Sequence, residues 1–201
     1  MQYKTEKLFY KLSIGIFIVY LILMLWVITF KCNMVHSITD TYLFFKDFTL
    51  SERFYFYIVP FKDYIEGPFL SQINTIIQDD LLNVFLFIPF GMYLTLFLKK
   101  RSFIKVFLMS CLLSSILELF QLITIIGSFS TKDIITNTIG GIFGYFINRI
   151  IYKENNSINK IKVLNIITIV VLIIFIPLTI YAVFNTIKHF DFYLDIINQT
   201  I

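Results

Sequence analysis

The feature that most constrains this chain is a series of long apolar stretches, because about 20 consecutive apolar residues are enough to cross a bilayer as a helix. Five such stretches occur, at residues 12–30, 81–98, 103–126, 134–152 and 163–184. The chain of 201 residues is 58% hydrophobic and 15% charged, whereas a soluble domain carries about 25% charged residues. A soluble core cannot bury that much apolar surface. The sequence therefore predicts an all-α fold, a polytopic integral membrane bundle of about five transmembrane helices.

Basic residues gather in the short segments that one face of the membrane would hold. Three lysines precede the first stretch, and the tight turn between the second and third reads Lys99-Lys100-Arg101. Cytoplasmic loops carry an excess of Lys and Arg, so we place this face in the cytoplasm. No small-residue cleavage pattern follows the first stretch, which we expect to be an uncleaved anchor. The prediction is a multi-pass protein of the cell membrane with a cytoplasmic N-terminus and an extracellular C-terminus.

The apolar stretches divide the chain into four segments. Residues 1–30 are expected to form an N-terminal anchor helix, and residues 31–80 an extracellular segment whose many aromatic side chains favour the membrane surface or the bundle mouth. Residues 81–152 should form a three-helix core, and residues 153–201 a C-terminal transmembrane helix with an extracellular tail. The net charge of +4 is spread between the apolar stretches, so we expect membrane lipids as partners and no nucleic acid.

One acid, Glu118, interrupts the third apolar stretch. Ser110, Ser114, Glu118 and Gln121 follow one another at intervals of four, four and three residues, which places them on one face of a helix. A carboxylate in hydrocarbon is so costly that Glu118 must be neutralised by neighbours, stay protonated or face internal water. An intramembrane acid of this kind indicates a functional site by default, and we favour that interpretation over a purely structural one.

Polar residues of the neighbouring stretches reach the same level of the membrane. Asn83 lies near the start of the second stretch and Asn137 near the start of the fourth, whereas Glu118 lies about 12 Å before the end of the third. Short turns join the three helices as antiparallel neighbours, so these ends coincide. We therefore predict a ligand-binding site in the outer half of the bilayer. Its residues are Asn83, Glu118, Gln121, Asp133 and Asn137.

Most of these residues also have a structural alternative. Asp133 could complete a capping box with Ser130 at the start of the fourth helix, and this is at least as well supported as a direct role. The three amide side chains could serve as interhelical hydrogen-bond partners. Gly91, Gly140 and Gly144 are predicted to allow close helix packing, because the last two form a GxxxG motif.

The sequence carries no pattern that predicts a metal or a cofactor. His36 and His189 are isolated, without the spacing of a zinc site. We find no phosphate loop, no Cys–His pair and no serine nucleophile signature, so no cofactor, metal or catalytic residue is assigned.

Three segments in this order resemble the VanZ-like family of bacterial membrane proteins. They are NVFLFIPFG from Asn83, ILELFQ around Glu118, and DIITNTIGGIFGY from Asp133. The resemblance covers about half the chain, and it implies that the predicted site residues and glycines belong to the family pattern. The segment before the fourth helix departs from that pattern, because SFSTKD has Ser130 and Lys132 where the family commonly has acids.

The resemblance implies a role in low-level resistance to glycopeptides such as teicoplanin, and in some members to lipopeptides. Our leading hypothesis is that the polar site binds or shields an outer-leaflet amphiphile, either a lipid-linked cell-wall precursor or a lipidated antibiotic. The alternatives are a membrane enzyme that uses Glu118 and Asp133 as acid and base, and a transporter subunit in which Glu118 titrates. Association through the GxxxG motif would allow an oligomer.

Overall fold

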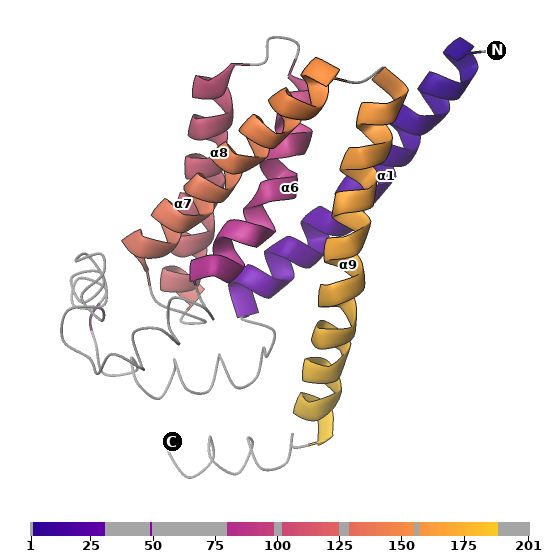
Figure 1. Cartoon of the computed structure of the whole chain (residues 1–201). Helices are drawn as coiled ribbons and strands as arrows, with labels where there is room; N and C mark the ends of the chain where they lie inside the picture. Colours follow the sequence, from indigo (N-terminus) through magenta and orange to yellow (C-terminus); the bar gives the residue numbers. More distant parts are fainter. Residues whose placement is uncertain are drawn as a thin grey trace.

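All regular structure in the described part of this chain is helical. A computed structural model describes residues 2–30, 49, 80–98, 102–124, 129–154 and 157–188 (Figure 1). Within these residues the helices, in chain order, are α1 (Gln2–Phe30), α6 (Leu81–Phe97), α7 (Phe103–Thr124), α8 (Thr131–Glu154) and α9 (Ser157–Lys188). The predicted all-α membrane bundle is confirmed. Outside the described residues lie almost all of the predicted aromatic segment 31–80 and the tail from residue 189 on.

The helices extend beyond the apolar stretches at several ends. Helices α6 and α7 begin where the sequence predicted, at Leu81 and Phe103, but α9 begins at Ser157 and not at residue 163. The first turns of α9 contain Lys160 and Lys162, which suit a helix but do not count as apolar. A search for apolar runs therefore finds the part of a helix inside hydrocarbon and misses its polar ends.

Four of the described helices are long and apolar enough to cross a membrane. Their apolar spans are Lys7–Thr29, Phe103–Thr124, Thr131–Ile151 and Asn159–Asn185. Helix α6 has 17 residues, about 26 Å at ~1.5 Å per residue, somewhat less than the ~30 Å hydrocarbon core. It lies inside the bundle, where Phe87 and Tyr93 are fully buried. Because most of α6 from Leu86 to Thr95 is buried in protein, this helix does not need to match the thickness of the lipid.

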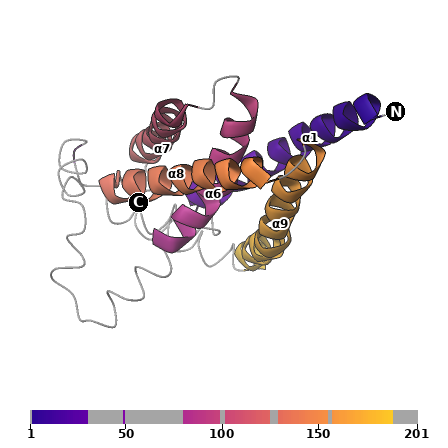
Figure 2. The same ribbon diagram turned by 45° about the horizontal axis from the view of Figure 1, so that its top comes forward.

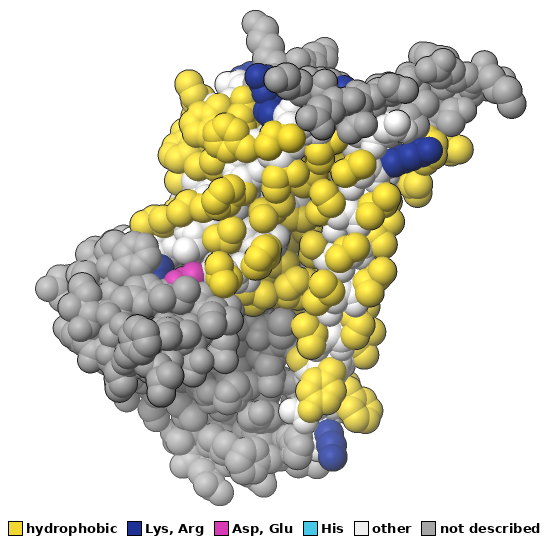
Figure 3. All heavy atoms as spheres, in the orientation of Figure 1, with side chains coloured by type: hydrophobic (Ala, Val, Ile, Leu, Met, Phe, Trp, Pro, Cys, Tyr) yellow, Lys and Arg dark blue, Asp and Glu magenta, His cyan; other side chains and the backbone are white. Residues whose placement is uncertain are grey.

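The helices alternate in direction, so their ends meet at two levels. Helices α6 and α8 begin at the lower end in Figure 1, where α1, α7 and α9 finish. We call this the Asp80 end, after the residue that precedes α6. On the face drawn in Figure 3, most of the described side chains between the two ends are hydrophobic, as expected of a surface that faces lipid.

Helices α6 and α8 pack against each other through backbone contact. A Cβ atom on Gly140 would overlap the carbonyl of Val84, and one on Gly144 would overlap the carbonyl of Ile88. Seen from a second direction, α6 and α8 still cross in contact (Figure 2). Small residues are the usual means by which membrane helices approach so closely. This pair therefore forms the most closely packed part of the described bundle.

Candidate functional site

The carboxylate of Glu118 lies inside the protein, at the start of α8. The side chain is 1% exposed, and its Oε2 accepts a hydrogen bond of 2.7 Å from the backbone N–H of Ser130. Ser130 directly precedes α8, where backbone N–H groups have no partner within the helix and the helix dipole favours negative charge. The structure thus shows how an acid is accommodated in this apolar stretch: another helix supplies the donor.

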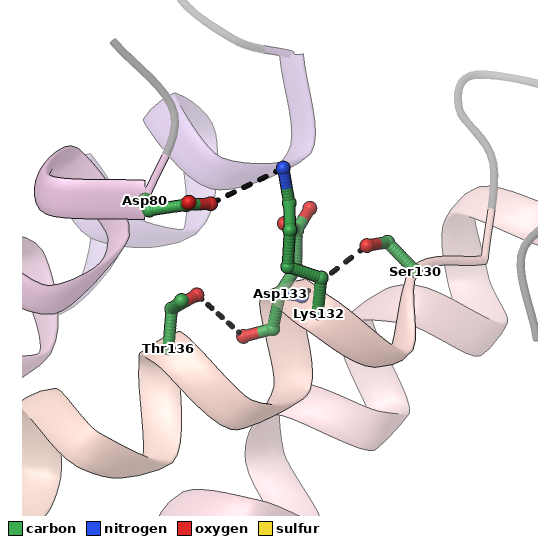
Figure 4. Close-up of polar contacts among 5 residues, drawn as sticks. All are labelled: Asp80, Ser130, Lys132, Asp133 and Thr136. Atoms are coloured by element: carbon green, nitrogen blue, oxygen red, sulfur yellow. Dashed lines mark hydrogen bonds and ion pairs between the residues drawn. The ribbon is translucent and has the colours of Figure 1, made fainter. Parts of the chain in front are cut away.

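Ser130 and Asp133 form one half of the capping box that the sequence allowed. The backbone N–H of Asp133 donates to Ser130 Oγ at 3.2 Å, and Thr136 Oγ1 donates to the Asp133 carbonyl at 3.2 Å (Figure 4). In a complete box the acid at the third position would accept the N–H of the capping residue. Here that N–H donates to Glu118 of α7. The capping interactions therefore tie α7 to the start of α8.

Asn137 lies one helical turn beyond Asp133 and contacts α7. Its Nδ2 donates to Ser114 Oγ at 2.9 Å, and both residues are fully buried. Ser114 is four residues from Glu118, so this pair lies about one turn, ~5.4 Å, deeper than the carboxylate. Asn137 Oδ1 is buried and has no hydrogen-bond partner among the described residues. An amide oxygen accepts hydrogen bonds only, so this position calls for a donor.

Gln121 points to a different helix. Its Nε2 donates to the carbonyls of Ile28 and Thr29, at 3.1 and 3.0 Å. These carbonyls belong to the last turn of α1, where they have no partner within the helix. Gln121 thus caps α1, a role that agrees with the interhelical alternative for this amide.

Asn83 lies in the first turn of α6, half-buried. Its side chain makes no hydrogen bond to another described residue. At the same end, Lys132 Nζ lies 3.2 Å from Asp80 Oδ1, and this ion pair joins the starts of α6 and α8 (Figure 4). Lys132, one of the two residues that depart from the family pattern, therefore forms an ion pair within the chain. That all five predicted site residues share one ligand stays a prediction.

A second buried polar group lies toward the opposite end of the bundle. Asn165 Oδ1 of α9 accepts hydrogen bonds from Ser13 of α1, at 2.9 Å, and from Tyr93 of α6, at 3.1 Å. We call these three residues the Asn165 cluster. Sequence reasoning missed it, since the fifth helix showed no functional signal. Its one trace in the sequence is a lone Asn within an apolar helix.

The described residues hold no group of three or more His, Cys, Asp or Glu side chains that could bind a metal ion. The site at the Asp80 end is instead built from hydrogen-bond acceptors close to a helix start. Among the described residues at this end are the acids Asp80, Glu118 and Asp133 and the buried amide oxygen of Asn137, and Lys132 pairs with Asp80. Such a site suits a ligand that donates hydrogen bonds.

Comparisons with known proteins place this geometry in a family. The model of the VanZ/LLP1 family matches residues 17–153, which extend from α1 to the last turn of α8 and contain Glu118 and Asn137. The chain is 29% identical to Protein VanZ from Enterococcus faecium over 170 residues, which make up 85% of this chain and 92% of that protein. No solved structure matches the chain. The chain belongs to the VanZ/LLP1 family.

Proposed function

We propose that this membrane protein contributes to resistance against glycopeptide antibiotics by binding or shielding an amphiphile of the outer leaflet at the Asp80 end. The amphiphile would be a lipid-linked cell-wall precursor or a lipidated antibiotic. The observation that carries the proposal is the burial of Glu118 within protein at a helix start. An ionisable side chain held in a membrane segment by partners of this kind commonly marks a ligand or ion site.

The charges of the described residues support an outward-facing Asp80 end. The opposite end carries exposed basic side chains on all of its described helix termini except that of α6, namely Lys7, Lys11, Lys105, Arg149 and Lys162. Basic residues mark the cytoplasmic face of membrane proteins. The Asp80 end would then face the outer leaflet, where glycopeptides and cell-wall precursors are present.

The neighbours of Glu118 support a binding role more than a capping role alone. Any acceptor could cap Ser130, and a glutamine would do so without placing a formal charge among apolar helices. A charged hydrogen bond is roughly twice as strong as a neutral one. Glu118 therefore suits an interaction that needs charge, and Asn137 adds a buried acceptor one turn away. Glu118 lies on α7 and Asn137 on α8, and both are within the residues that match the family model.

Antibiotic susceptibility of a glycopeptide-sensitive Gram-positive host tests the proposal. The host would produce the native chain, Glu118→Gln, Glu118→Ala or Tyr93→Phe at equal membrane levels. We expect the native chain and Tyr93→Phe to raise the inhibitory concentration of teicoplanin, and both Glu118 variants to lose that protection. Tyr93→Phe is the control because it removes one buried hydrogen bond in the Asn165 cluster. Full protection by both Glu118 variants would contradict the proposal.

A further inference from the structure

An arginine near the end of α8 carries a charge that no described residue neutralises. At the end of the bundle opposite the Asp80 end, α8 finishes where α7 begins (Figure 1). Arg149 is exposed there, and its guanidinium carbon lies 6.0 Å from the centre of the Tyr145 ring. It forms no ion pair with any residue that the structure describes. The guanidinium is therefore available to an anion from outside the chain.

Aromatic rings of α7 and α8 lie beside this arginine. The Tyr145 ring packs edge-on against Phe103 of α7, with 5.6 Å between the ring centres, and Phe103 lies 6.1 Å from Phe146. Tyr145 is buried, whereas Phe103 is 41% exposed and Phe146 50% exposed. We call Arg149, Tyr145, Phe103 and Phe146 the Arg149 site. It combines a cation with two apolar rings on the surface of the bundle.

The Arg149 site lies at the level where hydrocarbon meets headgroups. The apolar span of α7 begins at Phe103 and that of α8 ends at Ile151, so Arg149 is about 3 Å along the axis from the end of its span. Basic side chains near helix ends extend into the headgroup region, and aromatic rings favour the same level. A phospholipid presents a phosphate and acyl chains together, so it matches both the guanidinium and the exposed rings.

An anionic headgroup suits this site better than a zwitterionic one. The guanidinium can donate two parallel hydrogen bonds to a phosphate. In phosphatidylcholine the phosphate already has a cation in its own headgroup, whereas in phosphatidylglycerol it has none. Lys99, Lys100 and Arg101 directly precede α7 in the sequence, and basic residues next to a membrane helix add to the attraction of anionic lipids.

We propose that the Arg149 site binds an anionic phospholipid, with the guanidinium on the phosphate and the exposed rings of Phe103 and Phe146 against the acyl chains. One such lipid contacts α7 and α8 together, because Phe103 belongs to α7 and Arg149 to α8. This site is separate from the Asp80 end and does not depend on the function proposed there.

Lipid-dependent thermal unfolding of the full-length chain in a neutral detergent tests the site. A ligand that binds only the folded chain raises the unfolding temperature according to its affinity. The probes are phosphatidylglycerol and phosphatidylcholine with identical acyl chains. We expect phosphatidylglycerol to bind the native chain about fivefold more tightly, the usual contribution of one basic residue at a membrane surface.

Three variants separate the Arg149 site from the general charge of this end. Arg149→Gln should lose the preference for phosphatidylglycerol, and Arg149→Lys should keep part of it, because it retains the charge without the paired donors. Lys105→Gln is the matched control. Lys105 is exposed on the same turn of α7 as Phe103 but two residues away, so it lies on nearly the opposite side of the helix, and its variant should behave like the native chain.

Inorganic phosphate, replacing chloride at constant ionic strength, distinguishes a lipid from a soluble anion. We expect it to leave the unfolding temperature unchanged, because it offers nothing to the exposed rings. A rise in unfolding temperature with phosphate alone that is lost in Arg149→Gln would overturn the lipid assignment. Equal binding of both lipids, an unchanged preference in Arg149→Gln, or an equal loss in Lys105→Gln would overturn the site itself.

Discussion

Helix α8 contacts α6 and α7 through two interfaces of opposite character. Toward α6 it presents Gly140 and Gly144, and the backbones touch with no space for a further methyl group. Toward α7 it presents Asn137 and the capping residue Ser130, which hold Ser114 and Glu118 by hydrogen bonds. The first interface is fixed by backbone contact, whereas the second combines these hydrogen bonds with one close contact, between Gly141 and the side chain of Ser110. If the proposed amphiphile enters the bundle, we expect it to enter between α7 and α8 and not between α6 and α8.

The largest expected effect comes from breaking the α6–α8 contact. In Gly144→Leu the side chain would overlap the Ile88 carbonyl and lie against Met92, so the two backbones must separate. We expect a loss of about 3 kcal/mol or more in stability, because overpacking of a well-packed core costs about 1–3 kcal/mol even without backbone overlap. Folded yield and thermal unfolding in nanodiscs measure it. Gly15→Leu is the matched control, since a Cβ on Gly15 of α1 meets nothing within 4 Å.

The next largest effect is expected for Glu118, where two variants separate the contribution of the hydrogen bond to Ser130 from that of the negative charge. Glu118→Ala leaves the Ser130 N–H without its acceptor, and we expect a loss of about 1–3 kcal/mol in stability. Glu118→Gln keeps an acceptor and should lose less than about 1 kcal/mol. Thermal unfolding of both variants in one lipid composition measures the difference. Equal losses would show that the charge itself, and not the cap, stabilises this contact.

Removing the hydrogen bonds between α7 and α1 should lower stability by a smaller amount. Gln121→Leu removes two hydrogen bonds to the last turn of α1, and we expect a loss of about 1 kcal/mol. Hydrogen exchange at the end of α1 should rise in this variant. Thr124→Ala is the control, since Thr124 is exposed and its hydroxyl donates within its own helix; an equal rise there would argue against the Gln121 cap.

The smallest effect concerns the Asn137–Ser114 hydrogen bond. Ser114→Ala should lower stability by about 0.6 kcal/mol, the usual contribution of such bonds between membrane helices. A double-mutant cycle with Asn137→Ala isolates the coupling between the two side chains. A coupling near zero would show that this bond does not hold α7 to α8, and the contrast between the two interfaces of α8 would then rest on Glu118 alone.

The sequence predicted the positions of the helices and the polar face of α7, because these follow from the length and the spacing of apolar and polar residues. Apolar length located the helices, and the spacing from Ser110 to Gln121 placed the polar residues of α7 on one buried face. The hydrogen bond from Ser130 to Glu118 could not be predicted, because its donor is a backbone N–H and any residue at position 130 except proline would supply one. Lys132 and Asp80 offered a weak signal, opposite charges at the starts of neighbouring helices. The Asn165 cluster joins side chains of three helices from distant parts of the chain, so no local sequence pattern predicts it.

The central claim is that α7 and α8 enclose a site for a polar headgroup at the level of Glu118, while α6 and α8 stay in contact. An experimental structure of the full chain in nanodiscs that contain teicoplanin tests it most directly. The account predicts headgroup density within hydrogen-bond distance of the Glu118 carboxylate and Asn137 Oδ1, with Gly144 still against α6. Density confined to the outer surface of the bundle, or a Glu118 side chain that faces acyl chains, would contradict it.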